Sequence, residues 1–227
     1  VMDPRGTALK RFAPHMLQFK PGADVSMLNA IMNVIVEEKL YDHDYISHQT
    51  ENWQAEKEHL SAFTPEAMED ICGIPANELR AAARTFARGK AGMIFWGMGI
   101  SQHVHGTDNS RCLISLALMT GNVGRPGAGL HPLRGQNNVQ GASDAGLIPM
   151  FLPDYQSVTD QKIRHSFTEV WQSDDFSNEK GLTVTEIMDA IHGDSILGMY
   201  ILGENPAMSD PDVEHARKAL AKLDHLV

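Results

Sequence analysis

The stretch of this 227-residue sequence whose residue types best suit chemistry is 127–146, GAGLHPLRGQNNVQGASDAG. Glycines leave backbone N–H groups accessible, and amide side chains surround one arginine, Arg134. Arg134 is the only lysine or arginine between Arg125 and Lys162. An isolated guanidinium in such a setting suits a carboxylate or a phosphate, which it can hold through two parallel hydrogen bonds. The alternative is a surface loop whose arginine caps a helix end.

Three further turns could bind a ligand: 3–5, 97–102 and 203–209. Each follows a short apolar segment, and ligands of open α/β sheets gather at the carboxyl ends of strands. Gln102 stands where a dinucleotide fingerprint would need its third glycine, so 97–102 is a weak nicotinamide signature. Each turn alone is more often structural. Together with the central stretch, the three turns favour a large polar cofactor.

Histidines and cysteines give no metal site. His103 and His105 are two positions apart, but no third ligand lies nearby, so a structural role is favoured. His131 could line a site around Arg134. Cys72 and Cys112 form no CxxC motif, which excludes a recognisable zinc or iron–sulfur motif in this sequence and indicates a reducing, cytoplasmic compartment.

The elements around these residues follow an α/β pattern. Asp24 is placed to cap a helix with an apolar face. Before the central stretch we expect helical pieces in 41–61, helices at 64–73, 77–88 and 107–119, and a buried strand at 92–97. The stretch 127–146 shows neither helical nor strand periodicity, so a loop is expected there.

After the central stretch the same order recurs. Thr183 and Glu186 form a capping box that opens a helix ending near Gly193. A strand is expected at 196–202 and a helix from about 210 to 223. Both ends of the sequence, at Val1 and at Val227, are predicted to lie in strands, which suggests a piece of a longer chain. The sequence therefore predicts two α/β units with largely parallel sheets, residues 1–133 and 134–227.

Composition narrows the possible partners. The formal net charge of −10 argues against nucleic acid and against an anionic membrane surface. No apolar run approaches membrane-spanning length, and no signal peptide is visible at the start. An apolar content of 42% is sufficient for a folded core.

Two runs carry a family resemblance: NVGRPGAG at 122–129 and PLRGQNNVQGASD at 132–144. They closely resemble the catalytic (alpha) subunit of the molybdopterin-dependent formate dehydrogenases. The resemblance extends from DPR at 3–5 through GMG at 97–99 to GENP at 203–206. The run RGQNNVQG at 134–141 is specific for the formate branch, whereas the other motifs are shared among related molybdenum enzymes.

The resemblance implies two three-layer, Rossmann-like α/β units that hold molybdenum or tungsten between two molybdopterin guanine dinucleotides. By matching motifs, one guanosine end would be served by Asp3, Arg5, Gly22 and Asp24. The second dinucleotide would be served by Gln102, Gly203, Asn205 and Ser209. A carboxylate can accept hydrogen bonds from both N1–H and the N2 amine of guanine, although helix capping remains the alternative for Asp24.

The implied reaction is the oxidation of formate to carbon dioxide, with Arg134 holding the formate carboxylate and Gln136 lining the site. The metal-ligating cysteine or selenocysteine and the cysteines of a 4Fe-4S cluster belong upstream in the family. The chain alone is therefore expected to be inactive and to need the rest of a longer chain and electron-transfer subunits. Unpaired sheet edges suggest a homodimer. Two alternatives stay open: a nitrate reductase-like molybdopterin enzyme, and a non-catalytic α/β binding or assembly domain.

Overall fold

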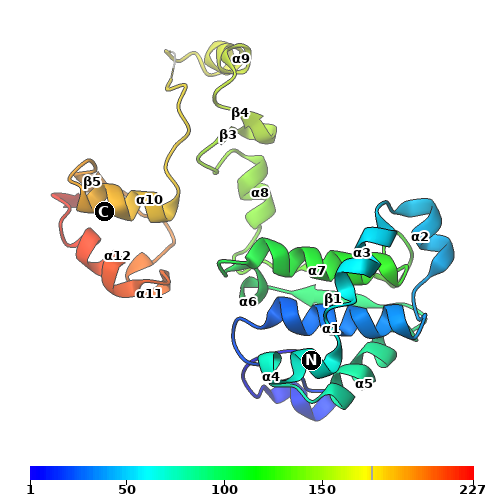
Figure 1. The fold of residues 1–227 in the computed structure, drawn as a ribbon. Coiled ribbons are helices and arrows are strands. Elements are labelled where there is room, and N and C mark those ends of the chain that lie inside the picture. The colour runs from blue at the N-terminus through cyan, green and yellow to red at the C-terminus, as the bar shows by residue number, and fades with distance from the viewer. Residues whose placement is uncertain (175) are drawn as a thin grey trace. The chain divides into compact units, whose positions relative to one another are not determined.

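The computed structural model describes residues 1–174 and 176–227 and contains two compact units, Val1–Gly135 and Gln136–Val227. Figure 1 colours the first unit from blue to green and the second from green to red. The sequence predicts this boundary near residues 133–134. The assignment of one guanine dinucleotide to each unit stays a prediction.

The first unit is built around α1 (Asp24–Glu37), which lies among the other helices (Figure 1). Side chains from Met27 to Ile35 are buried without interruption, so the helix is enclosed on all sides rather than along one stripe. It packs against α3 (Trp53–Leu60), α4 (Pro65–Cys72), α5 (Ala76–Ala87) and α7 (Gly106–Met119). The short elements η1 (Ala8–Phe12) and α2 (His43–Gln49) complete the helical part.

Local capping signals in this unit are confirmed. The Thr64 hydroxyl accepts a hydrogen bond from the Ala67 N–H at 3.2 Å, and Pro65 occupies the first turn of α4. Gly73 ends the helix with φ of 75°, a left-handed conformation that glycine adopts without steric cost. These residues set both ends of α4 through contacts within a few positions of the chain.

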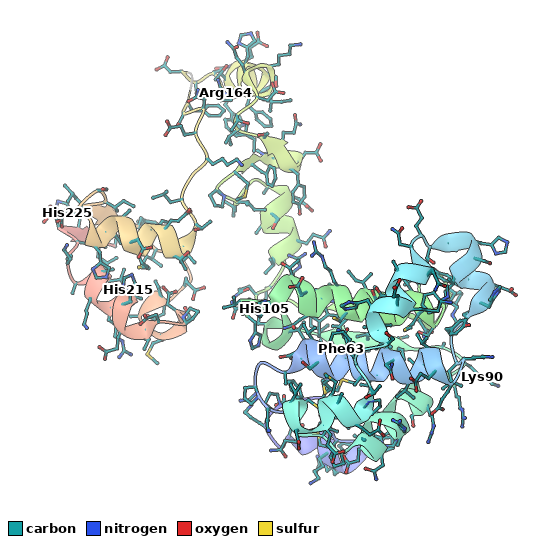
Figure 2. All side chains as sticks on the ribbon, viewed as in Figure 1. Phe63, Lys90, His105, Arg164, His215 and His225 are labelled. Atoms are coloured by element: carbon teal, nitrogen blue, oxygen red, sulfur yellow. The ribbon has the colours of Figure 1, made fainter. Side chains whose placement is uncertain are left out.

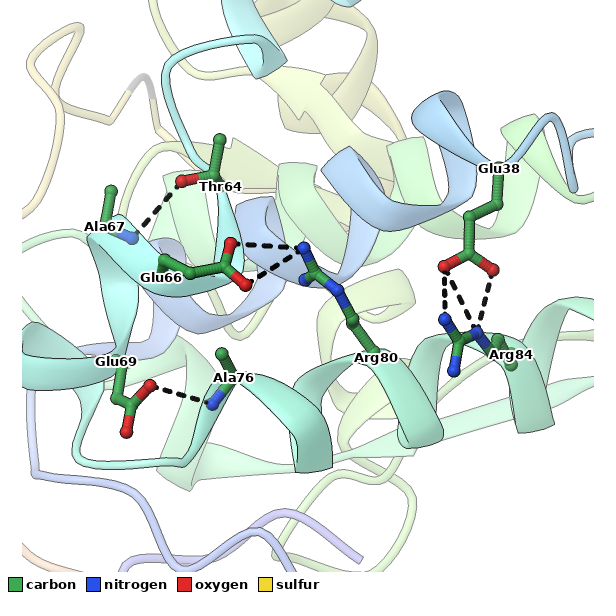
Figure 3. A network of polar contacts seen from close by, with 8 residues as sticks. All are labelled: Glu38, Thr64, Glu66, Ala67, Glu69, Ala76, Arg80 and Arg84. Atoms are coloured by element: carbon green, nitrogen blue, oxygen red, sulfur yellow. Dashed lines mark hydrogen bonds and ion pairs between the residues drawn. The ribbon is translucent and has the colours of Figure 1, made fainter.

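Ion pairs join the helices on one side of α1 (Figure 3). Arg84 of α5 donates to Glu38 at the end of α1 through Nε at 2.8 Å and Nη2 at 2.7 Å, and this fork lowers the pKa of Glu38. Arg80 pairs with Glu66 of α4 at 3.0 Å. The two-pronged Arg84–Glu38 pair fixes the direction of both side chains as well as their distance. The network therefore sets how α5 lies against α1 and α4.

The first parallel strand pair joins β1 (Met93–Trp96) to β2 (Gly129–Pro132), with Met93 opposite Gly129. The crossover between them runs through α6 (Met98–Ser101) and α7. Ile94 and Trp96 pack on the helical core. The expectation of a fully buried strand is wrong, because the alternate side chains, Met93 and Phe95, are 48% and 57% exposed. Only one face of β1 is packed.

The prediction of a loop throughout 127–146 is also wrong in two places. Its first part contains β2, and its last part contains α8 (Val139–Asp144). The strand forms because β1, far earlier in the chain, supplies its hydrogen-bond partners. Asn138 is the N-cap of this helix: it has φ of 52° and its side chain accepts from the Gly141 N–H at 3.2 Å. Residues 133–138 between them have no helix or strand.

The second unit continues with an antiparallel pair and then a second crossover. Its next elements are β3 (Phe151–Leu152), η2 (Pro153–Tyr155), β4 (Gln156–Ser157) and α9 (Gln161–Trp171). They are followed by α10 (Val184–His192), β5 (Gly198–Met199), α11 (Pro206–Ser209), α12 (Val213–Leu220) and β6 (His225–Leu226). The predicted capping box of Thr183 and Glu186 is confirmed.

β5 and β6 pair in parallel across α11 and α12, as β1 and β2 do across α6 and α7. The strand is shorter than the expected 196–202, because β6 supplies pairing partners only for Gly198 and Met199. Met188 and Ile191 of α10 pack on Ala216 and Ala219 of α12 as a separate core. Beside it, His215 of α12 (Figure 2) lies 3.0 Å from the Asp189 carboxylate.

The α/β class with parallel strand pairing is therefore confirmed. In the described residues, each sheet has two strands, and the β3–β4 pair alone is antiparallel. None of the helices in this part of the chain combines the length and the apolar character that crossing a membrane requires.

Candidate functional site

Two of the predicted ligand-binding segments meet at one edge of the first sheet. β1 leads into Gly97, the N-cap of α6, and Gln102 is the C-cap that follows α6. β2 leads through Leu133 to Arg134. The Leu133 N–H donates to the Trp96 carbonyl at 2.6 Å, which extends the pairing beyond the strands. A Cβ on Gly97 would lie 3.2 Å from the Leu133 carbonyl oxygen, so the glycine permits this close approach.

Arg134 is exposed at this edge. Within residues 1–174 and 176–227, no hydrogen bond or ion pair engages its guanidinium, and so none joins it to a helix end, contrary to the alternative in which it caps a helix. All five of its N–H donors are available to a ligand. Gln136, also exposed, begins the second unit. The substrate-binding roles of both residues remain predictions.

The first unit contains a pocket of about 910 Å³, which we call the α1–α7 pocket because α1, α3 and α7 form its walls. Its lining includes Gly22, Asp24, Asn29, His103, Asn109 and Cys112. Gly22 has φ of 83°, and a Cβ there would meet no atom within 4 Å. The left-handed φ, rather than a lack of space, favours glycine at this position. The volume of the pocket suits a small-molecule ligand.

Asp24 is the acidic group of the α1–α7 pocket. It is not the helix cap: Ala23 occupies that position, and Asp24 is the first residue of α1. Its side chain is buried, with the whole residue 3% exposed. Burial raises the pKa of Asp24, outweighing the opposing effects of its own backbone N–H and of His103. Apart from that N–H, no described residue donates to the carboxylate, so it can accept hydrogen bonds from a ligand.

The raised pKa gives a pH-dependent prediction for Asp24→Asn. The folded state holds the Asp24 proton more tightly than the unfolded state, so stability decreases as pH rises from the ordinary value of 3.8 through the folded-state pKa. The side-chain amide that replaces the carboxylate has no charge to desolvate. At pH 7 we expect the variant to have a higher free energy of unfolding than the unsubstituted chain, and below pH 3.8 we expect the difference to vanish.

Urea denaturation at several pH values measures this difference. The same substitution at Asp44, which is exposed on α2, serves as the control. A stability difference for Asp24→Asn that is equal at pH 3 and pH 7 would contradict the desolvation argument.

Asp3 and Arg5 lie outside the lining of the α1–α7 pocket. The Asp3 Oδ1 accepts a hydrogen bond from the Arg5 N–H at 2.7 Å and lies 3.7 Å from the Arg5 Nε. This turn is anchored where the Asp3 N–H donates to the Leu17 carbonyl. Of the four residues assigned to one guanosine end, the structure thus brings only Gly22 and Asp24 into the same pocket.

The turn at 203–209 belongs to the second unit. Gly203 has φ of 72°, and Asn205 precedes α11, which ends at Ser209. Glu204, which the sequence analysis did not select, hydrogen-bonds to both of these residues. The signal that could have identified it is an acidic residue directly before an N-cap asparagine, with a hydroxyl five positions later.

Asn29 and Asn109 are further pocket residues that the sequence analysis missed. Both are buried. Asn29 interrupts an apolar stretch of α1, which was the available signal, whereas Asn109 lies among polar residues of α7 and gives no such signal. Cys112 donates to the Asn29 Oδ1 at 3.5 Å. Burial, together with Glu56 and Asp108, raises the pKa of the Cys112 thiol to about 11. The thiol therefore stays protonated and is unsuited to act as a nucleophile.

The histidines near the pocket do not form a metal site in the described residues, where no group of three or more His, Cys, Asp or Glu side chains is arranged to hold an ion. His103 Nε2 lies 2.7 Å from the Gly99 carbonyl oxygen. His105 (Figure 2) lies 3.9 Å from the Asp108 carboxylate at the start of α7. Both contacts are local to the turn.

The family model described as molybdopterin oxidoreductase matches residues 1–227. The F420-dependent formate dehydrogenase subunit alpha of Methanocaldococcus jannaschii is 42% identical over 228 residues, which cover 100% of this chain and 33% of that subunit. Formate dehydrogenase H of Escherichia coli is 40% identical, over 100% of this chain and 32% of its own length. A nitrate reductase of Synechocystis is 33% identical over 97% of this chain and 31% of its own.

The chain spans about a third of the length of these relatives. Among solved structures, the acetylene hydratase from Pelobacter acetylenicus superimposes with a TM-score of 0.68 over 99% of this chain and 33% of that one. At 18% sequence identity this likeness concerns the fold alone.

Proposed function

Because the chain belongs to the molybdopterin oxidoreductase family, we propose that it is part of the catalytic subunit of a formate dehydrogenase, which oxidises formate to carbon dioxide. The observation that carries this proposal is the free guanidinium of Arg134, exposed where β2 ends. Support comes from the two formate dehydrogenase relatives at 42% and 40% identity. The run at 134–141, which is typical of the formate branch, also supports this proposal.

In this proposal Arg134 binds and orients the substrate. A guanidinium keeps its charge at any working pH, and its planar fork matches the two oxygens of a carboxylate. Formate has few groups besides its carboxylate, so its orientation depends on the hydrogen bonds that the guanidinium donates to that carboxylate. Gln136 lines the substrate site and contributes a neutral hydrogen bond.

The residues present fit a guanine-containing cofactor. The buried carboxylate of Asp24 is open to the α1–α7 pocket and can accept from two adjacent N–H groups, and Gly22 lines the same pocket. Asp3 and Arg5 would complete this guanosine end. Gln102, Gly203, Asn205 and Ser209 would hold the second of two molybdopterin guanine dinucleotides. Bound there with molybdenum or tungsten, the cofactor would supply the two-electron redox chemistry that formate oxidation requires.

The other components belong to the longer protein. We place the metal-ligating cysteine or selenocysteine and the 4Fe-4S cluster in parts of the polypeptide outside this sequence, with electron-transfer subunits as partners and the cytoplasm as location. The sheet edges of β1–β2 and β5–β6 offer a surface for a homodimer. A strictly monomeric profile in solution would contradict the dimer.

The proposed cofactor predicts a base preference. Guanine presents N1–H and the N2 amine side by side, whereas adenine has no such pair, so the Asp24 carboxylate should favour guanine. We expect GMP to bind this chain more tightly than AMP in calorimetric titrations, and Asp24→Asn to reduce the difference. Equal or tighter binding of AMP would contradict the role of Asp24.

The decisive experiment measures formate-dependent and nitrate-dependent turnover of the longer protein under identical conditions. Formate oxidation without nitrate reduction supports the proposal. The reverse result supports the second candidate, a nitrate reductase, which the relative at 33% identity favours. If neither substrate is turned over and the longer polypeptide lacks the cluster cysteines, the result supports a non-catalytic binding or assembly domain.

A further inference from the structure

The turn at 203–209 is held by one carboxylate oxygen. The Oε1 atom of Glu204 accepts the Ser209 hydroxyl at 2.7 Å and the Asn205 N–H at 3.1 Å. No described residue engages Oε2. Both donors come from residues assigned to the second dinucleotide, whereas Glu204 has no assigned role.

These two bonds determine what Ser209 can offer a ligand. A serine hydroxyl has one hydrogen. The Ser209 oxygen lies 2.7 Å from the Glu204 carboxylate and 3.1 Å from the Asn205 carbonyl oxygen, and the shorter, charge-assisted bond takes the hydrogen. Only lone pairs remain on Ser209, so it presents an acceptor to its surroundings.

The backbone hydrogen bonds of this turn also determine which groups of Asn205 remain available to a ligand. Its backbone N–H is committed to Glu204, and its carbonyl oxygen accepts from the N–H groups of Met208 at 2.9 Å and Ser209 at 3.0 Å. The side-chain amide has no partner among the described residues. Gly203, in a left-handed conformation, lets the chain enter this turn. The turn therefore presents a free amide and a hydroxyl acceptor on one short segment.

The charge that orders the turn is present at working pH. The Ser209 hydroxyl, followed by the Asn205 N–H, lowers the pKa of Glu204 below its ordinary value of 4.5. A carboxylate in this state accepts hydrogen bonds and donates none.

We propose that Glu204 is a positioning residue for the second dinucleotide: it fixes the Ser209 hydroxyl as a hydrogen-bond acceptor and holds the Asn205 backbone, so that the ligand group facing Ser209 must be a donor. This inference rests on the proposed function, in which Asn205 and Ser209 contact a guanine dinucleotide. The N–H groups of guanine meet that requirement, whereas an unprotonated phosphate oxygen does not.

The first test needs no ligand. The NMR shift of the Asn205 amide proton is followed against pH in the 227-residue chain, where it should report the ionisation of Glu204. In Ser209→Ala the larger of the two stabilising bonds is lost, so the midpoint should move up toward the ordinary glutamate value. An unchanged midpoint, or an amide that does not respond to pH in this range, would overturn the proposal.

The second test is a double-mutant cycle with GMP as the probe, made in the Asp24→Asn background because the Asp24 carboxylate is also proposed to bind guanine. Glu204→Leu and Ser209→Ala should each weaken GMP binding by roughly five- to tenfold, the effect of one hydrogen bond. The double variant should be no weaker than the worse single variant, because Glu204 acts through Ser209. Glu204→Gln keeps the acceptor oxygen and should restore most of the affinity. Glu214→Gln, in an exposed ion pair of α12, is the matched control.

Three results would overturn the role of Glu204: unchanged GMP affinity in Glu204→Leu, additive losses in the double variant, or no GMP binding by the Asp24→Asn chain that serves as the background. Formate turnover of the longer protein is measured separately. Retained formate oxidation together with any of these results would reject the positioning role and leave the proposed function intact.

Discussion

Arg134→Lys in the longer protein is expected to lower formate turnover per metal by roughly ten- to a hundredfold, with the cofactor content little changed. Lysine keeps the charge but replaces the flat, two-pronged donor with a flexible point charge. The loss of one charge-assisted hydrogen bond costs about 1.5–3 kcal/mol, which converts to that range of rate. Steady-state formate oxidation, normalised to bound metal, measures the effect.

Two further substitutions sharpen the test. Arg134→Ala should reduce turnover further because it removes the charge as well. Gln136→Ala should have a smaller effect because it removes a neutral contact. If Arg134→Ala protein carries its full metal content and oxidises formate at the original rate, Arg134 does not hold the substrate.

Ile31→Ala is expected to lower the free energy of unfolding by about 2–5 kcal/mol, the usual cost of removing a large aliphatic side chain from a packed core. Ile31 is 1% exposed and lies in the part of α1 that is enclosed on all sides. The surrounding helices pack against one another as well as against α1, so they cannot close the resulting cavity completely. Urea denaturation followed by circular dichroism measures the loss.

Ile71→Ala is the matched control, because it removes the same atoms from α4 at a position that is 51% exposed. We expect a change below about 1 kcal/mol for this variant. Similar losses at both positions would mean that α1 is not the centre of the first unit.

Much of the fold follows from signals confined to a few neighbouring residues. Thr64, Gly73 and the pair Thr183–Glu186 specify helix ends through bonds that span at most four positions, and the structure forms each of them. β2 could not be predicted in this way, because its hydrogen-bond partners on β1 are distant in sequence. The same limit explains Phe95: local hydrophobicity identifies a strand but does not reveal which of its faces will be covered.

In the candidate site, too, some residues can be predicted from local sequence signals and others cannot. Arg134 is a candidate ligand-binding residue from the sequence alone, because it stands isolated among glycines and amides. The structure leaves its guanidinium without a partner among the described residues. For Asp24 the sequence leaves two roles open, guanosine binding and helix capping, because it cannot distinguish a helix starting at Asp24 from one capped by it. Because the helix starts one residue earlier than a cap at Asp24 would require, the Asp24 carboxylate lines the pocket and does not cap the helix. Asn109, in the same wall, lies among polar residues, so its place there depends on how α1 and α7 pack, which no local pattern encodes.

The protonated state of Cys112 makes the chain convenient for site-specific labelling. Alkylating reagents such as maleimides react with the thiolate, and a thiol with a pKa of about 11 holds roughly two orders of magnitude less thiolate at neutral pH than an ordinary cysteine. Cys72 is buried within α4 and inaccessible to reagent. A cysteine introduced at Val104, which is 98% exposed, should therefore take up a fluorophore or spin label selectively while both native cysteines are retained.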